Sequence, residues 1–145
     1  MRSPDAEVAS ALVRLSGMSL AEVAEHLGIS VETYRSYQSG RLKWPEHRLE
    51  ELRQVCVAIY SRACTITEVI EERTGEMGPP GVIEIALPSS DTEARHDGLP
   101  AVGCVRAVAA MVATMHPEVD VRLVPRDSTP GTRAAQSART GRPRP

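Results

Sequence analysis

The stretch Ser19–Gly40 constrains the fold of this chain most, because it holds closely spaced signals for the start and end of helices. Ser19 with Glu22 three residues later predicts a capping box at the start of one helix. Gly28 follows the last apolar residue of that helix, where a left-handed end is favoured, and Ser30 is placed to cap a second helix. The stretch therefore predicts two short helices joined by a tight turn, which is the spacing of a helix-turn-helix.

The second helix of this stretch has the residue types of a helix that reads DNA. Such a helix enters the major groove, and small or polar side chains near its start reach the base edges. Tyr34 and Tyr37 lie three residues apart and are expected to anchor its inner face. We expect base contacts from Val31, Glu32, Thr33, Arg35 and Ser36, and phosphate contacts from Ser30, Ser39, Arg41 and Lys43. The alternative is a two-helix corner that serves packing alone.

The motif resembles the XRE, or lambda-repressor-like, family of DNA-binding domains, on Ser19–Ala24, Leu27–Ser30, Tyr34, Tyr37 and Gly40. The resemblance covers about residues 5–56 and implies a five-helix DNA-binding head. Two positions depart from the family pattern. Leu20 stands where the family often has a Gln that grips the DNA backbone, and Gln38 stands where it usually has Glu.

A narrower resemblance rests on Ser30, Thr33, Tyr34, Tyr37–Arg41 and Pro45. These residues are similar to those of anti-CRISPR-associated repressors of the second type, which are small regulators of phages or mobile elements. The resemblance implies a DNA-binding head followed by a short strand-helix-strand part that forms a dimer.

Apolar residues at alternating spacings of three and four predict a long helix from about Pro45 to Arg73. They are Leu49, Leu52, Cys56, Ile59, Ala63, Ile66 and Ile70. This a/d pattern is typical of a seam between helices, but it also fits a core-facing stripe of one domain, with or without a break near residues 61–65. We expect the first half to cover the head and the second half to pack on the C-terminal part or on another protomer. In the first helix of the chain, the apolar face is expected to be Ala11, Leu12 and Leu15.

The C-terminal part has the pattern strand, polar loop, helix, strand, over Val82–Leu87, Pro88–Gly98, Pro100–Met115 and Val119–Val124. Two strands do not form a stable sheet alone, so we expect them to pair with the same strands of a second copy. The residues expected to form this dimer are Ile66, Ile70, Ile83, Ile85, Val105, Val121 and Leu123.

The predicted fold class is therefore mainly α with a small α+β C-terminal part. Residues 1–60 form the helix-turn-helix head, residues 61–125 the dimerisation part, and residues 126–145 a disordered tail rich in Arg and Pro. The 145-residue chain has a net charge of only −2, so it lacks the overall basic charge of a protein that coats nucleic acid. Its charge is distributed unevenly: ten Asp or Glu stand against five Arg in residues 61–125.

The sequence gives no reason to expect an enzyme, a cofactor or a metal site. Its histidines are scattered, at His26, His47, His96 and His116. The cysteines Cys56, Cys64 and Cys104 have no metal-binding or disulfide pattern, which indicates reduced thiols and a cytoplasmic protein. No apolar run is long enough to span a bilayer.

Together these features predict a homodimeric transcriptional regulator that binds double-stranded DNA. The expected role is an autoregulatory repressor on an inverted-repeat operator, with half-site centres about 34 Å apart. The alternative is a protein-interaction module, such as an antitoxin-like adaptor whose C-terminal part binds a partner protein.

Overall fold

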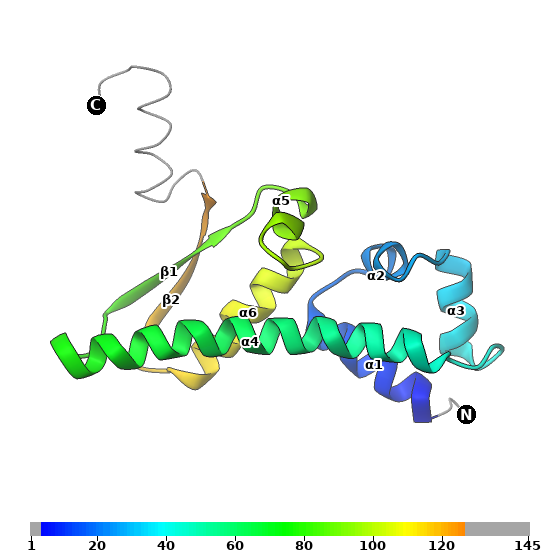
Figure 1. Cartoon of the computed structure of the whole chain (residues 1–145), viewed down its shortest axis with the longest axis horizontal. Coiled ribbons are helices and arrows are strands. Elements are labelled where there is room, and N and C mark those ends of the chain that lie inside the picture. Colours follow the sequence, from blue (N-terminus) through cyan, green and yellow to red (C-terminus); the bar gives the residue numbers. More distant parts are fainter. Residues whose placement is uncertain (1–3, 127–145) are drawn as a thin grey trace, which may run out of the picture.

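A single 32-residue helix, α4 (Glu46–Met77), runs along most of the molecule (Figure 1). The computed structural model describes residues 4–126. At one end, α1 (Pro4–Ser16), α2 (Leu20–Leu27) and α3 (Val31–Ser39) surround the N-terminal half of α4. Toward the other end lie β1 (Val82–Leu87), α5 (Asp91–His96), α6 (Val102–Met115) and β2 (Asp120–Pro125). The described chain is thus mainly helical, with a small two-stranded sheet in its C-terminal part, as the sequence predicts.

The long helix predicted from Pro45 to Arg73 is confirmed, and it is continuous through residues 61–65. This segment contains no Gly or Pro, and the Thr65 hydroxyl donates to the Ser61 carbonyl within the helix at 3.1 Å. The expected head of five helices is not what the structure has. Its head consists of α1, α2, α3 and the first half of α4, because the helix after the α3–α4 loop continues unbroken into the C-terminal part.

The two strands pair with each other, in parallel, within one chain. Ile83 lies opposite Val121 and Ile85 opposite Leu123. The connection between parallel strands passes through α6, which packs on both strands and also on α4. The strands thus pair within one chain, and the crossover helix α6 packs on them from inside the chain. Their pairing with the same strands of a second copy stays a prediction.

The segment predicted as a polar loop, Pro88–Gly98, contains the short helix α5. Ser90 caps this helix by accepting a hydrogen bond from the Glu93 amide at 3.2 Å. The Glu93 carboxylate in turn accepts bonds from the amide and hydroxyl of Ser89, at 2.7 and 2.8 Å. Ser-x-x-Glu is a start signal for a helix, so this element was predictable from the sequence.

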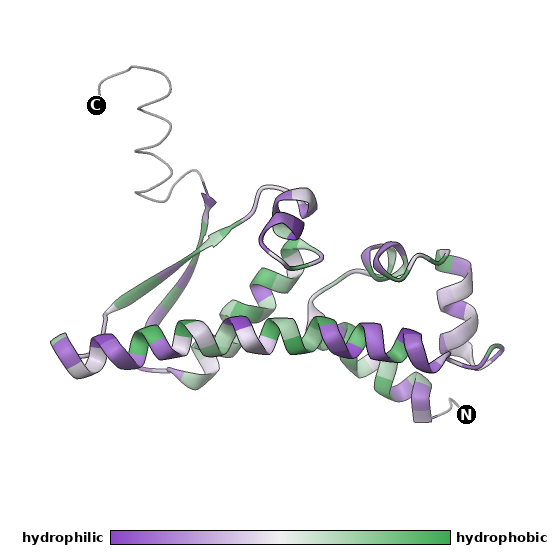
Figure 2. Cartoon of the chain, viewed as in Figure 1, coloured by the Kyte–Doolittle hydropathy of each residue, from purple (hydrophilic) through white to green (hydrophobic). Residues whose placement is uncertain are grey.

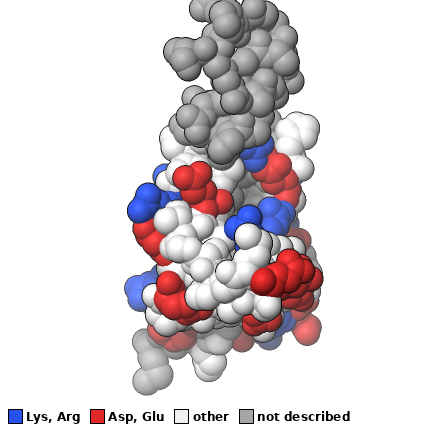
Figure 3. Space-filling model, turned by 90° about the vertical axis from the view of Figure 1, so that its left-hand side faces the viewer, with Lys and Arg blue, Asp and Glu red and all other residues white. Residues whose placement is uncertain are grey.

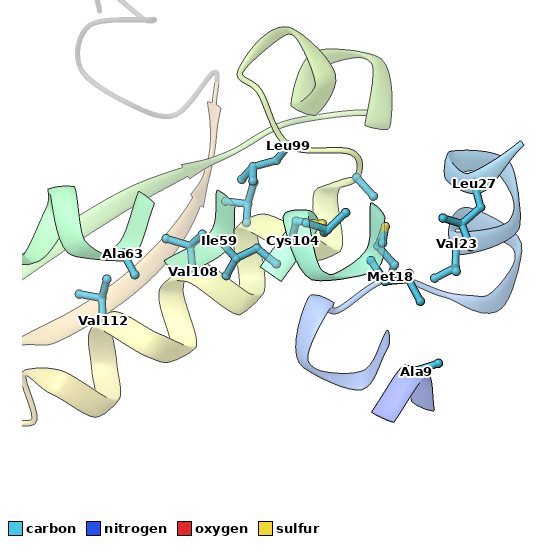
Figure 4. Close-up of a cluster of buried hydrophobic side chains, with 14 of the residues drawn as sticks. Ala9, Met18, Val23, Leu27, Ile59, Ala63, Leu99, Cys104, Val108 and Val112 are labelled. Atoms are coloured by element: carbon cyan, nitrogen blue, oxygen red, sulfur yellow. The ribbon is translucent and has the colours of Figure 1, made fainter. Parts of the chain in front are cut away.

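One buried apolar cluster extends from the head into the C-terminal part (Figure 4). Ile59 and Ala63 of α4 are fully buried, and Val108 and Val112 of α6 lie beside them. The predicted boundary at residue 60 therefore falls in the middle of α4, inside this cluster. Colouring by hydropathy shows α6 as mostly apolar, whereas α4 has many polar positions (Figure 2). No described helix has both the length and the hydropathy to cross a membrane.

The apolar face of α1 differs from the predicted one. Ala6 and Ala9 are fully buried, whereas Ala11 is exposed and Leu15 is 49% exposed. Only Leu12 of the three predicted residues packs against the core. The small side chains of Ala6 and Ala9 allow α1 to come close to its neighbours.

Backbone contact between two glycines joins the head to the C-terminal part. Gly17 ends α1 with a φ of 73°, and its carbonyl faces Gly103 in the first turn of α6. A Cβ atom at Gly103 would lie 2.0 Å from the Gly17 oxygen, and one at Gly17 would lie 2.3 Å from the Gly103 oxygen. Both positions need glycine, because any side chain would push α1 and α6 apart.

We predict that Gly103→Ala lowers the free energy of unfolding by about 1–3 kcal/mol, because the added methyl group overpacks this contact. Urea denaturation followed by circular dichroism measures the change. Gly75→Ala is the matched control, since Gly75 lies inside α4 with nothing within 4 Å of the added Cβ. The control should raise the stability by about 0.5–1 kcal/mol. Equal effects of the two substitutions would show that the glycine contact is not tight.

Candidate functional site

The corner between α2 and α3 has the local structure that its sequence predicts. The Ser19 hydroxyl accepts from the Glu22 amide at 3.2 Å, and the Glu22 carboxylate accepts from the Ser19 amide at 2.8 Å. Gly28 has the left-handed φ of 68°, and Ser30 caps α3 by accepting from the Thr33 amide at 3.0 Å. These bonds satisfy two of the free amides at the start of α2 and one at the start of α3, and they fix where each helix begins.

Three aromatic rings hold the inner face of α3. The edge of Tyr34 meets the ring of Trp44 with 5.8 Å between centroids, and Tyr37 lies 4.9 Å from the same ring. Gln38 joins this group by accepting from the Trp44 indole at 3.0 Å and donating to the Tyr34 hydroxyl at 3.2 Å. The two tyrosines are thus on the inner face, as predicted. Trp44 and Gln38 were not predicted to belong to this site.

Ser36 does not present its side chain to solvent. It is 4% exposed, and its hydroxyl donates to the Glu32 carbonyl at 3.1 Å. The same hydroxyl accepts a bond from the Arg41 guanidinium at 2.5 Å. The expectation that Ser36 reads a base is therefore wrong, because its position in the helix turns it toward the core. Arg41 was expected at a phosphate, and in this structure its guanidinium closes the end of α3.

The outer face of α3 is exposed at Glu32 and Arg35, and half-buried at Val31 and Thr33. Glu32 and Arg35 are one helical turn apart, and no ion pair between them is present in the structure. The four remaining base-contact candidates thus lie on the first two turns of α3, where the helix is accessible. Ser30 and Ser39 are also exposed, and both hydroxyls are used in the helix ends: Ser30 donates to Thr33 Oγ1 at 2.9 Å and Ser39 to the Ser36 carbonyl at 3.2 Å.

The segment from residue 33 to residue 45 has three positive charges and no Asp or Glu. The charges are Arg35, Arg41 and Lys43. Lys43 is exposed in the loop between α3 and α4. At the opposite end of the molecule, where α4 ends, acidic and basic side chains are interspersed (Figure 3). The segment at the end of α3 is thus basic in sequence, while Asp5, Glu46 and Glu50 line the same groove as Lys43.

Arg48 connects the start of α4 to the end of α2, a role that no motif in the sequence indicates. Its guanidinium donates to the Leu27 carbonyl and forms an ion pair with Glu51 at 3.1 Å. The bond uses a carbonyl that the end of α2 leaves without a partner inside the helix. Together with Trp44, it fixes the loop that leads from α3 to α4. Of these missed residues, only Trp44 carried a sequence signal, as the single Trp of the chain.

The residues expected to form a dimer are largely used inside the protomer. Ile70 is fully buried and Val105 is 7% exposed, so neither is available to another copy, and their assignment is wrong. The half-buried residues Ile66, Ile83, Ile85 and Val121 pack against the same core. Leu123, at 37% exposed, is the most accessible of the seven. The stripe on α4 was read correctly as a seam, but α6 of the same chain fills it.

The described residues contain no group of three or more His, Cys, Asp or Glu that could hold a metal ion. Burial raises the pKa of the Cys104 thiol to about 11 and also raises the pKa of Cys56. Both thiols are therefore protonated at neutral pH and poor nucleophiles. The accessible outer face of α3 and the loop after it are the best candidate site in the described chain.

We predict that Gln38→Leu destabilises the head by about 1–3 kcal/mol, because the buried Trp44 indole loses its acceptor. Gln38→Glu should remain close to wild type, since a carboxylate still accepts from the indole. The single Trp allows urea denaturation to be followed by its fluorescence. A Gln38→Leu protein that unfolds at the same urea concentration as wild type would show that this bond does not support α3.

Comparison of the sequence with models of known protein families gives no match. Comparison with curated proteins gives no match either. The function must therefore be inferred from the side chains around α3.

Proposed function

We propose that the protein is a sequence-specific DNA-binding transcriptional regulator with α3 as its recognition helix. The observation that carries the proposal is the two-sided character of α3. Its inner face is fixed by the Tyr34, Trp44 and Gln38 group, while Glu32 and Arg35 face outward. A rigid helix with exposed polar side chains and a basic segment at its end is the arrangement that major-groove recognition needs.

Arg35 is the principal base reader in this proposal. Its side chain is long and exposed, and a guanidinium matches the two acceptors of guanine in the major groove. Glu32, one turn earlier, either holds Arg35 in place or accepts a bond from a cytosine amine. Val31 and Thr33 are half-buried and would contribute apolar contacts close to the start of the helix.

Contacts to the DNA backbone come from the loop after α3. Lys43 is exposed there, and Arg41 stands two residues before it with its guanidinium already bound to Ser36. Ser30 and Ser39 are exposed at the two ends of α3 and complete the set of phosphate contacts. Leu20 packs against the core, so it adds no polar contact to the backbone.

The proposed regulator acts as a homodimer on an inverted-repeat operator and represses its own promoter by occlusion. A single α3 of nine residues provides little contact area, whereas two copies bound to two half-sites combine their binding free energies. The resemblance to small repressors of phages or mobile elements supports the repressor role.

A second candidate is an interaction module in which the α2–α3 corner is only a scaffold. The charge of the head favours it, since residues 4–60 contain eight Asp or Glu against six Arg or Lys. A head of this composition attracts DNA only through its local basic segment. In this alternative the C-terminal part would bind a partner protein, as an antitoxin does.

Selection of bound sequences from a random DNA pool tests the main proposal. An enriched inverted repeat, bound in a mobility shift that weakens as salt rises, would support a regulator. The DNA upstream of the protein's own gene should then contain that repeat. No enrichment from the pool, combined with a stable complex with a second protein, would favour the interaction module.

We predict that Arg35→Ala weakens binding to the selected operator about tenfold or more, from the loss of about 1–3 kcal/mol of base discrimination. Binding to random DNA should change little. Arg73→Ala is the matched control, because Arg73 is exposed on the far part of α4 and should leave both affinities unchanged. Equal losses on operator and random DNA would show that Arg35 contacts phosphate instead of a base.

We predict that Lys43→Ala weakens binding to every DNA sequence and reduces the magnitude of the salt slope by roughly 0.9, the value for one phosphate contact. Lys43 is the only lysine of the chain, so its acetylation is easily followed by mass spectrometry. Bound DNA should protect Lys43 from the reagent. An unchanged salt slope and undiminished acetylation would remove Lys43 from the interface.

A further inference from the structure

α4 has a second, mostly apolar stripe that the protomer covers only in part. Val57, Tyr60, Cys64 and Thr67 follow one another at spacings of three and four. Val57 is 46% exposed and Tyr60 is 58% exposed, while Cys64 and Thr67 are half-buried. The stripe lies beside the one that α6 fills, and its spacing is that of a helix-helix seam.

An apolar groove of about 680 Å³ adjoins this stripe. Tyr60 forms its wall on α4, Leu15 its wall on α1, and Met111 and Met115 belong to its α6 side. Leu15 is 49% exposed and Met115 is 41% exposed, so three helices bring accessible apolar side chains together. Ala107 and Ala110 also line the groove, and such small side chains allow the close approach of another helix.

The charges around this surface are arranged in two groups. Arg14 and Arg106 line the groove, and neither forms an ion pair with any residue between 4 and 126. Glu68, Glu71 and Glu72 follow the stripe on α4, about two to three turns beyond Tyr60, and all three are exposed. The molecule thus has both a groove with two arginines and a helix segment of complementary, acidic charge.

We propose that this groove and stripe form the interface between two copies of the chain, with the α4 helices crossing in opposite directions. The acidic half of α4 of each copy then lies over the arginines of the other. This inference rests on the homodimer of the proposed function and assigns its surface. The contact is isologous, so each attraction occurs twice.

Cys64 lies near the two-fold axis in this arrangement. It stands midway between Tyr60 and Glu68, so an antiparallel pair that sets Tyr60 beside Glu68 of the second copy brings the two Cys64 residues together. Tyr60 and Cys64 are four residues apart on α4, so their side chains are neighbours on one face of the helix. Cys56 and Cys104 are buried and remain outside the interface.

A second copy fits this surface because α4 itself provides the required occupant. The groove needs a helix with apolar and acidic side chains. The second half of α4, which follows Tyr60, is such a helix. An acidic helix of another protein would have the same chemistry. Experiments on the purified chain alone separate the two.

Complementary charge reversals provide the sharpest test. One full-length variant combines Arg14→Glu with Arg106→Glu, and the other combines Glu68→Arg with Glu71→Arg. Each variant alone would place like charges across both halves of the interface, so its dissociation constant should rise about tenfold or more. An equimolar mixture should form a heterodimer, because every contact then joins opposite charges. Sedimentation equilibrium at micromolar concentration measures all three states.

Mild oxidation of the wild-type chain tests the position of the axis. A disulfide needs Cα atoms within about 7 Å, so a covalent dimer on a non-reducing gel should form only if the two Cys64 residues meet. Cys64→Ser should abolish this dimer, and Cys56→Ser should leave it unchanged. Circular dichroism of each variant confirms that it is folded.

A functional dimer should have a dissociation constant far below about 100 μM. A wild-type protein that is monomeric in sedimentation at that concentration would therefore overturn the proposed interface. So would a dimer that the charge variants leave intact or that the mixture does not restore. These measurements are made in the absence of DNA, so they test the interface independently of DNA binding. A protein that dimerises as described but selects no DNA sequence would contradict the proposed function and leave the interface standing.

Discussion

Burial of one stripe of α4 by α1 and α6 is the interaction on which the rest of the structure depends. A helix of 32 residues is stable in a small protein only if much of its length packs, because local propensity alone contributes little. The N-terminal half of α4 packs on α1, and Ile59, Ala63 and Ile70 are fully buried further along. Beyond Ile70 every residue up to Met77 is exposed. The packed part of α4 therefore joins the head and the C-terminal part into one core.

The parts of the fold that depend on neighbours in sequence were predictable. The capping box of Ser19, the left-handed Gly28 and the Ser30 cap each involve groups within four residues, so the sequence contains the whole interaction. The inner position of Tyr34 follows from helical periodicity in the same way. Trp44 was different, because its contact with α3 depends on the path of the loop and on the bond between Arg48 and Leu27. No periodic pattern encodes such a path.

Periodicity also fails to say which surface covers an apolar stripe. The pattern through Ile59 and Ile70 predicted a seam against either the C-terminal part or a second protomer. In the structure, α6 of the same chain packs against it. The parallel pairing of β1 with β2 has the same cause, since α6 allows the chain to return to the same sheet. Ser36 was misassigned for a related reason. Its polar side chain suggested an exposed position, but Arg41 and the Glu32 carbonyl satisfy its hydroxyl in a buried site.

The rigid connection between head and C-terminal part bears on how the proposed regulator would bind DNA. The glycine contact between Gly17 and Gly103 leaves no space for a side chain between α1 and α6, and α4 passes through both parts without a break. The orientation of α3 relative to the groove is therefore fixed within one copy. If two copies meet through that groove, their recognition helices are held at one separation before DNA is bound. Binding of the second half-site then costs little additional ordering, which is the physical basis of tight binding by a preorganised dimer.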